Sequence, residues 1–138
     1  MDNPLLNYPG YLLRRASKSR MVQLSQHLEP LGVGVSEGSI LVLIGRNPGL
    51  SQAECGRMLS IQRPILNPII RRFIARELVV STKGQGRIQC LHLSRTGEEL
   101  VKKIMVEFEA QEARIYEAVP EHLRDELVPL LRALWCPE

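Results

Sequence analysis

The sequence predicts a mostly helical chain of one domain that carries a single small β-hairpin. Apolar residues recur at three- and four-residue steps over most of the 138 residues, as they do in amphipathic helices. The pattern changes in one stretch, residues 79–93, where two short strand-like runs flank a glycine-rich turn. With 44% hydrophobic and 24% charged residues, the chain has the composition of a globular protein of one domain.

The composition also argues against several other classes of protein. The longest apolar run, Ile40–Ile44, is far shorter than the roughly 20 residues that a bilayer crossing needs. Residues Met1–Pro4 include an acid and a proline where a signal peptide has basic residues and then an apolar stretch. The cysteines, Cys55, Cys90 and Cys136, lack the spacing of a zinc knuckle. We therefore expect a cytoplasmic protein without a metal or a cofactor.

Residues 1–49 predict two helices. The first runs from about Tyr8 to Leu28, where apolar residues keep a helical spacing and basic residues lie on the other faces. A proline and two glycines within residues 30–34 end it. Ser36 is the expected N-cap of the second helix, which carries aliphatic residues up to the turn at Asn47–Gly49.

Residues 51–75 predict two short helices joined by a tight turn. Ser51 and Glu54 have the spacing of a capping box, in which the serine oxygen caps the helix and the glutamate reaches back to the serine. The pattern breaks at Ser60–Ile61 and a new helical pattern follows. Its core-facing residues are Leu66, Ile69, Ile70 and Phe73.

Two prolines leave the start of this second short helix open. It begins either near Pro64, with Pro68 one turn inside, or at Pro68 with Asn67 as its cap. The longer helix is favoured, because Leu66 and Phe73 already share one core-facing stripe.

The second short helix and the hairpin both carry polar and basic side chains. Arg63, Asn67 and Arg71 recur every four residues and share a helix face. A helix pair of this kind is typical of a helix-turn-helix, and a hairpin directly after it is a wing. The expected wing tip carries Lys83, Gln85 and Arg87, whose side chains can contact phosphates or a minor groove.

The rest of the chain predicts two further helices. Thr96–Glu99 has the pattern of a second capping box and opens a long helix to about Ala118. Pro120 opens a last helix, and Pro129 is expected to kink or weaken it. The apolar side of the last helix is formed by Leu123, Leu127, Leu130, Leu131 and Leu134.

The net charge of +3 is distributed unevenly. Residues 45–95 hold nine basic and two acidic side chains, whereas residues 96–138 hold five basic and ten acidic ones. A basic middle segment beside an acidic one is the pattern expected of a protein that binds a polyanion, although a solvated basic face gives the same count.

The order of elements and two stretches of sequence resemble the MarR family of bacterial winged helix-turn-helix regulators. Pro48–Glu54 is similar to the start of the helix that precedes the family's recognition helix, and Leu93–Gly97 to the exit from its wing. Arg63–Pro68 lies where the family has its recognition helix. The family's wing commonly carries Asp-x-Arg, and Gln85–Arg87 retains the arginine without the acid.

The resemblance implies a dimeric repressor that a small molecule releases from DNA. Residues 36–95 would bind DNA, while residues 1–30 and 96–138 would form the dimer. An effector, by the same resemblance a small aromatic anion, would lie near Tyr8, Tyr11 and Arg15, although packing in the dimer interface is an equal use for these side chains.

The sequence therefore predicts a DNA-binding regulator of transcription that acts on double-stranded, pseudo-palindromic DNA. A winged-helix module that binds proteins and has lost DNA binding is the alternative, and a small enzyme is disfavoured because no catalytic motif is present. Cys55 is expected to be a buried core residue rather than a redox sensor. The candidate DNA-binding residues are Ser51, Gln52, Gln62, Arg63, Asn67, Arg71, Lys83, Gln85 and Arg87.

Overall fold

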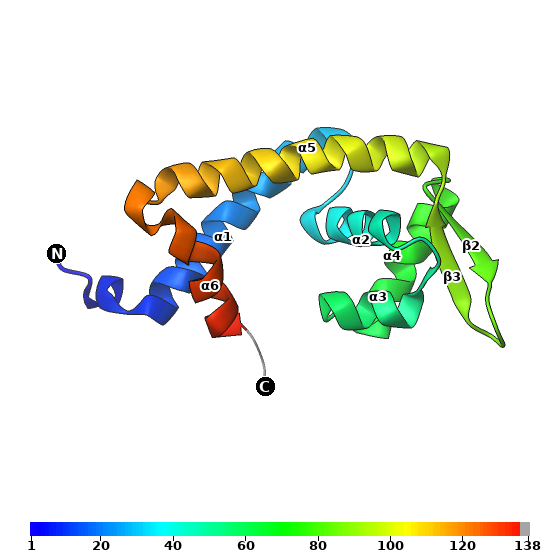
Figure 1. The fold of residues 1–138 in the computed structure, drawn as a ribbon, viewed down its shortest axis with the longest axis horizontal. Coiled ribbons are helices and arrows are strands. Elements are labelled where there is room, and N and C mark those ends of the chain that lie inside the picture. The colour runs from blue at the N-terminus through cyan, green and yellow to red at the C-terminus, as the bar shows by residue number, and fades with distance from the viewer. Residues whose placement is uncertain (136–138) are drawn as a thin grey trace.

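The computed structural model describes residues 1–135, so Cys136 and the end of the expected dimerisation segment lie outside the described residues. The described chain is mostly helical and has one small antiparallel sheet (Figure 1). Its elements in chain order are η1 (Pro4–Asn7), α1 (Pro9–Leu28), η2 (Glu29–Leu31), α2 (Val35–Arg46), β1 (Leu50–Ser51), α3 (Gln52–Leu59), α4 (Arg63–Ala75), β2 (Val79–Lys83), β3 (Gln89–Leu93), α5 (Arg95–Ala118), η3 (Glu121–Leu123) and α6 (Arg124–Trp135).

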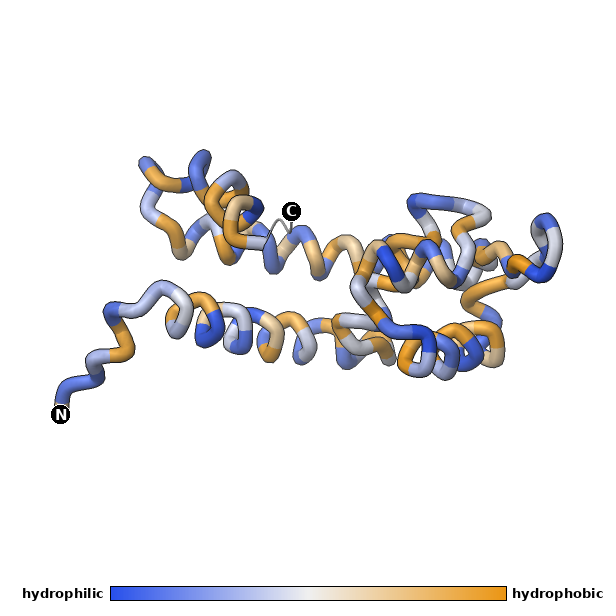
Figure 2. Tube along the Cα trace, turned by 90° about the horizontal axis from the view of Figure 1, so that it is seen from below, coloured by the Kyte–Doolittle hydropathy of each residue, from blue (hydrophilic) through white to orange (hydrophobic). Residues whose placement is uncertain are grey.

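The protomer is elongated, and α5 runs along its length (Figure 1). Helices α2, α3 and α4 and the sheet gather at one end of α5, and α6 folds back at the other end (Figure 1). Helix α1 lies against α5 (Figure 2). The described residues contain no single helix that is long and apolar enough to cross a membrane; α1 with η2 and α2 reach that length only as a pair bent by 70°.

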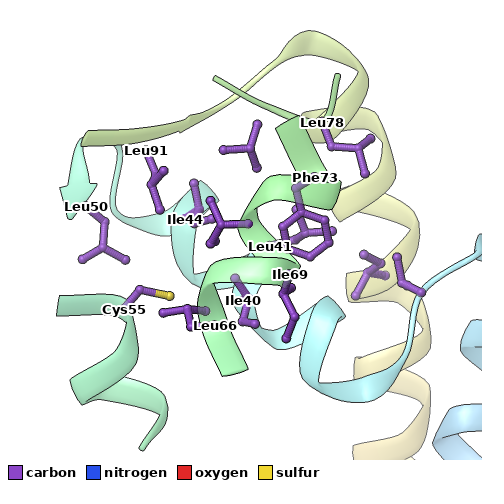
Figure 3. Close-up of a cluster of buried hydrophobic side chains, with 14 of the residues drawn as sticks. Ile40, Leu41, Ile44, Leu50, Cys55, Leu66, Ile69, Phe73, Leu78 and Leu91 are labelled. Carbon is purple, nitrogen blue, oxygen red and sulfur yellow. The ribbon is translucent and has the colours of Figure 1, made fainter. Parts of the chain in front are cut away.

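The hydrophobic core lies where α2, α3, α4 and the sheet meet (Figure 3). Ile40, Leu41 and Ile44 of α2 are fully buried, and so are Phe73 of α4 and Leu91 of β3. This core confirms the predicted inward face of α4. It fixes the two short helices against the hairpin, so they form one rigid unit.

The sheet has three strands in the order β1-β3-β2, one more than the sequence predicted. Strand β3 pairs with β2 in the expected hairpin, with Val79 opposite Leu93 and Lys83 opposite Gln89. It also pairs with β1, whose Leu50 and Ser51 lie opposite Leu91 and Cys90. The extra strand attaches the start of α3 to the wing.

Two of the predicted N-caps are wrong. Helix α2 begins at Val35 with Gly34 as its N-cap, so Ser36 lies inside the helix; the Gly34 N–H donates to Glu37 Oε1 at 3.3 Å. Helix α5 begins at Arg95 with Ser94 as its N-cap, so Thr96 also lies inside. The reason for the second shift is tertiary, because Ser94 donates to the carbonyls of Glu77 and Leu78, the two residues directly before β2.

The favoured long form of α4 is confirmed. The helix starts at Arg63, Gln62 is its N-cap, and Pro68 lies within it. At the other end of the chain, Pro120 is followed by the 3-10 turn η3, and α6 begins at Arg124 with Pro129 inside it.

Apolar side chains of η1, α1 and α6 are exposed in the protomer. The predicted apolar side of α6 is therefore not turned toward this protomer's core; Leu127 is half-buried, and the rest of that side is exposed. Figure 2 shows apolar positions recurring on α6 and on the N-terminal part of α1. The exposed residues with large apolar side chains in residues 4–28 and 121–135 are Leu5, Leu6, Tyr8, Leu12, Leu13, Met21, Val22, Leu123, Val128, Leu130, Leu131, Leu134 and Trp135.

Candidate nucleic-acid interface

The turn between α3 and α4 is held by backbone contacts. The Ile61 N–H donates to the Gly56 carbonyl at 2.9 Å, and Ser60 adopts a left-handed conformation with φ of 54°. A Cβ added to Gly56 would lie 2.8 Å from the Ile61 carbonyl oxygen, closer than a real Cβ contact. Position 56 therefore requires glycine, and the angle between the two helices is fixed locally.

The predicted capping box at the start of α3 is confirmed. The Ser51 N–H and hydroxyl donate to Glu54 Oε2 at 2.9 and 2.8 Å, and the Glu54 N–H donates to Ser51 Oγ at 3.2 Å. The backbone and side-chain hydrogen bonds from Ser51 hold the pKa of the Glu54 carboxyl below its ordinary value. Both donors of Ser51 are thus directed to Glu54, so Ser51 builds the start of the helix and offers neither donor to a phosphate in this arrangement.

Gln52 and Asn67 connect the two helices directly. The Gln52 Nε2 donates to Asn67 Oδ1, and the two residues are 15 apart in sequence. Adenine is read bidentately by an asparagine that donates with its amide and accepts with its oxygen. This hydrogen bond joins α3 to α4, and the second lone pair of the Asn67 oxygen and its amide N–H groups lie outside it.

Arg63 and Arg71 lie on the exposed surface of α4, as predicted. Gln62 is exposed directly before them. No acidic residue occurs between Arg63 and Ala75, so the exposed side of α4 has a purely positive charge. Arg72, which the four-residue spacing did not single out, is also exposed there, and its place beside Arg71 makes it a further candidate.

The wing places three more of the predicted side chains at its tip. Lys83 ends β2, and exposed Gln85 and Arg87 lie in the connection to β3. The Gly84 N–H donates to the Ile88 carbonyl at 2.8 Å, and Gly86 has a φ of 70°, which favours glycine. The ion pairs in residues 1–135 are formed by other groups, so Arg87 is free to pair with a phosphate.

The predicted effector residues lie on the N-terminal part of α1. Tyr8 is its exposed N-cap. Tyr11 is half-buried, and the guanidinium carbons of Arg14 and Arg15 lie 5.8 and 5.9 Å from its ring centroid, within the range of a cation–π contact. Tyr11, Arg14 and Arg15 thus form a cluster of their own, and neither they nor Tyr8 line the two cavities described next.

Two open cavities flank the contact between α1, α2 and α5. One, of about 510 Å³, is lined on its α1 side by Lys18, Met21, Val22, Ser25 and Gln26, and on its α2 side by residues 34–37. The other, of about 500 Å³, is lined by Leu24, Val35, Ser39, Met105, Phe108, Glu109 and Glu112. Both volumes are in the range of small-molecule sites.

The loop beside the first cavity is attached to the end of α4. Arg76, the C-cap of α4, donates from Nη1 to the Gly32 carbonyl at 3.0 Å. Gly32 precedes the residues of the α2 start that line the cavity, and its φ is 72°. A change in this loop would therefore act on the helix that carries Arg63 and Arg71.

Comparison with curated proteins identifies a close relative, although no protein-family model matches the chain. The HTH-type transcriptional repressor Rv2887 of Mycobacterium tuberculosis (strain ATCC 25618 / H37Rv) is 32% identical over 119 residues, which cover 83% of this chain and 81% of the repressor. The crystal structure of Rv2887 with p-aminosalicylic acid, described as that of a MarR family protein, matches with a TM-score of 0.73 and 27% identity over 91% of this chain and 97% of that one. The chain belongs to the MarR family.

A second solved MarR-like structure is the transcriptional repressor CouR bound to a 23-mer DNA duplex. It matches this MarR protein with a TM-score of 0.88 and 25% identity over 97% of both chains. A MarR family regulator from Rhodococcus sp. RHA1 shares the fold, with a TM-score of 0.85 at 20% identity over 99% of this chain and all of that one. The predicted winged helix-turn-helix fold is confirmed, and the family is one of transcriptional regulators rather than of enzymes.

Proposed function

We propose that this MarR protein is a dimeric repressor that binds pseudo-palindromic double-stranded DNA and that a small aromatic anion releases it. The main support is the acid-free exposed side of α4, next to a wing tip whose Arg87 forms no ion pair within residues 1–135. A helix and a hairpin of this kind fit the major groove and the adjacent backbone. A regulator of transcription acts where the chromosome lies, which in bacteria is the cytoplasm.

The roles of the candidate residues follow from their positions. Arg63 and Arg71 of α4 contact bases or phosphates in the major groove, with Gln62 beside them. Lys83, Gln85 and Arg87 contact the backbone or minor groove from the wing. The remaining candidates, Ser51, Gln52 and Asn67, hold α3 and α4 in position through the capping box and the Gln52–Asn67 hydrogen bond.

The two ends of the chain form the dimer, so residues 1–30 and 96–138 serve dimerisation and residues 36–95 serve DNA binding. Exposed apolar side chains gather on η1, α1 and α6, and a patch of this kind in a globular protein marks an interface. The recognition helices of a two-fold dimer then reach half-sites about one helical turn, roughly 10 base pairs, apart. Sedimentation equilibrium tests this: a stable monomer at micromolar concentration contradicts it, and Leu131→Glu is expected to dissociate the dimer.

The anion is expected in the cavity lined by Lys18. Its lining offers a carboxylate one lysine and the hydroxyls of Ser25 and Ser36, beside a single acid, Glu37, while Met21 and Val22 offer an apolar ring a contact surface. The second cavity is less suited to an anion, because its lining has two acids, Glu109 and Glu112, and no basic residue. Rv2887, the relative described above, forms crystalline complexes with p-aminosalicylic acid and salicylic acid, which are molecules of this class.

A ligand acts as a switch only if it binds one arrangement of the protein better than the other. The hydrogen bond from Arg76 to Gly32 connects the loop beside the Lys18 cavity to the end of α4, so a ligand that moves this loop also moves the recognition helix. The two recognition helices of the dimer would then no longer match the spacing of successive grooves.

Fluorescence anisotropy with duplexes from the DNA upstream of the protein's own gene tests the function. Nanomolar binding to one duplex, weaker binding to a scrambled one, and release by salicylate are the expected results. Lys18→Gln should reduce the release by salicylate, whereas Lys102→Gln, which removes an exposed lysine of α5 outside both cavities, should not. Equal binding to both duplexes would contradict sequence-specific repression.

A further inference from the structure

The first two turns of α4 expose an apolar patch in addition to the arginines. Ile65 is 59% exposed, and Pro64 and Pro68 are exposed beside it. Ile65 and Pro68 are three residues apart, which makes them neighbours on the helix surface. The adjacent side of the helix is fixed in the core by Leu66 and Ile69, so the patch lies at the edge of the buried side, where it is open to a partner.

The patch lies where a recognition helix reads bases. In helix-turn-helix proteins the N-terminal residues of this helix contact the base edges in the major groove. The polar side chain in the second turn, Asn67, is half-buried and already accepts from Gln52. Most of the exposed side-chain surface of these turns is therefore apolar, apart from Arg63 at the start of the helix.

The C5-methyl group of thymine is the feature of an unmodified base edge that an apolar side chain can recognise in the major groove. Charge complementarity selects DNA as the partner of this patch, because Arg71 and Arg72 follow Pro68 by three and four residues and no acid occurs on α4. The arginines can neutralise phosphates while the apolar patch lies over the bases.

We propose that Ile65, together with Pro68, reads the methyl groups of thymines and so contributes sequence specificity by apolar contact. This inference rests on the proposed DNA-binding function. It adds that each half-site contains a thymine whose methyl group lies against Ile65, and that specificity in the first two turns of α4 depends on burying that methyl group.

Replacing thymine with deoxyuridine tests the contact, because it removes the methyl group and keeps the Watson–Crick edge. The probe is a duplex that the wild-type protein selects from a pool with a randomised centre of about 20 base pairs, enough for two half-sites. Deoxyuridine at the contacted thymine should weaken binding about fourfold per half-site, the effect of one buried methyl-sized group. Other thymines of the duplex should tolerate the replacement.

Ile65→Ala connects the effect to this side chain. The variant should bind the thymine duplex about fourfold more weakly per half-site and should show no further loss with deoxyuridine. Val106→Ala is the matched control, since Val106 is a 63% exposed aliphatic side chain on α5; it should keep the full sensitivity to deoxyuridine. Ile65 is exposed, so its truncation leaves the core intact.

The possible results separate the inference from the function on which it rests. A protein that selects duplexes but tolerates deoxyuridine at every thymine overturns the inference alone. Full deoxyuridine sensitivity in Ile65→Ala also overturns it, because another residue would then read the methyl group. A protein that selects no sequence from the pool overturns the proposed function, and the inference with it.

Discussion

Gly97→Ala should destabilise the protein by about 2 kcal/mol, although alanine is the better helix former. Gly97 is buried in the first turn of α5, next to Leu78, the residue before β2. A Cβ at position 97 would lie 2.1 Å from the Leu78 carbonyl oxygen and 3.1 Å from its carbonyl carbon, whereas ordinary contacts begin at 3.4 Å. The backbone at Leu78 and the start of α5 approach each other so closely that no side chain fits at position 97.

The Leu78 carbonyl cannot move away freely, because it is already an acceptor. The Ser94 N–H donates to it at 2.9 Å and the Ser94 hydroxyl at 3.2 Å. Overpacking in a fixed site costs about 1–3 kcal/mol, and this site belongs at the upper end. The gain of alanine over glycine in a helix offsets about 1 kcal/mol, which leaves a net loss of about 2 kcal/mol.

Thermal unfolding at one fixed protein concentration measures the effect, since the Tm of a dimer depends on concentration. For a chain of this length the expected decrease in Tm is about 7 °C. Gly10→Ala is the control: Gly10 lies in the first turn of α1 with no atom within 4 Å of an added Cβ, so its Tm should rise slightly. If both variants were as stable as the wild type, the close approach of α5 to Leu78 would be refuted.

Three further predictions concern the interface and the titrating groups. Arg71→Ala should weaken binding to the selected duplex by about 1–3 kcal/mol, and Arg87→Ala by less, because the glycine-rich wing tip loses conformational freedom on binding. Anisotropy at two salt concentrations compares the two variants, and a larger loss from Arg87→Ala would show that the wing is preorganised. Burial raises the pKa of the Cys55 thiol, so iodoacetamide should label half-buried Cys90 first and Cys55 only after unfolding. Peptide mass spectrometry measures the order, and labelling of Cys55 in the native protein would contradict its burial. Because the pKa of Glu54 is lowered in the folded protein, its hydrogen bonds stabilise the fold fully above about pH 4.5 and lose that effect as the pH falls through the lowered pKa. The stability of Glu54→Gln should therefore depend less on pH in the acid range than that of the wild type, as urea unfolding can measure.

The sequence predicts most of the helices because local patterns determine them. The spacing of Leu66 and Phe73 identifies α4 and selects its longer form in spite of Pro68, since both residues belong to the core. The capping box of Ser51 and Glu54 is also local, with both partners three residues apart. Features of this kind need no knowledge of distant contacts.

The features that the sequence does not predict depend on distant partners. Strand β1 has two residues and exists because Leu50 and Ser51 pair with β3. Ser94 replaces Thr96 as the N-cap of α5 because its hydroxyl donates to the Glu77 carbonyl at 2.6 Å and its Oγ accepts from the Gly97 N–H. No spacing rule reveals these contacts.

In the candidate site, too, local patterns can be predicted from the sequence and contacts between distant residues cannot. The exposure of Arg63 and Arg71 follows from the helix period, whereas the Gln52–Asn67 hydrogen bond joins residues of two helices and changes the expected role of both. Resemblance alone indicates Tyr8, Tyr11 and Arg15 as effector residues; they do not line the Lys18 cavity, and their role stays a prediction separate from that site. The cavity beside Lys18 can be found only once the packing of α1 on α2 is known.

The salt dependence of binding to a selected and to a scrambled duplex tests the central claim most directly. Arg63, Lys83 and Arg87 of both protomers lie on exposed surface, and each phosphate that they neutralise adds about −0.9 to the slope of log affinity against log salt. Six such contacts give an expected slope of about −5 for both duplexes, with a higher affinity for the selected one at every salt concentration. Affinities that are equal for the two duplexes, or independent of salt, would contradict it.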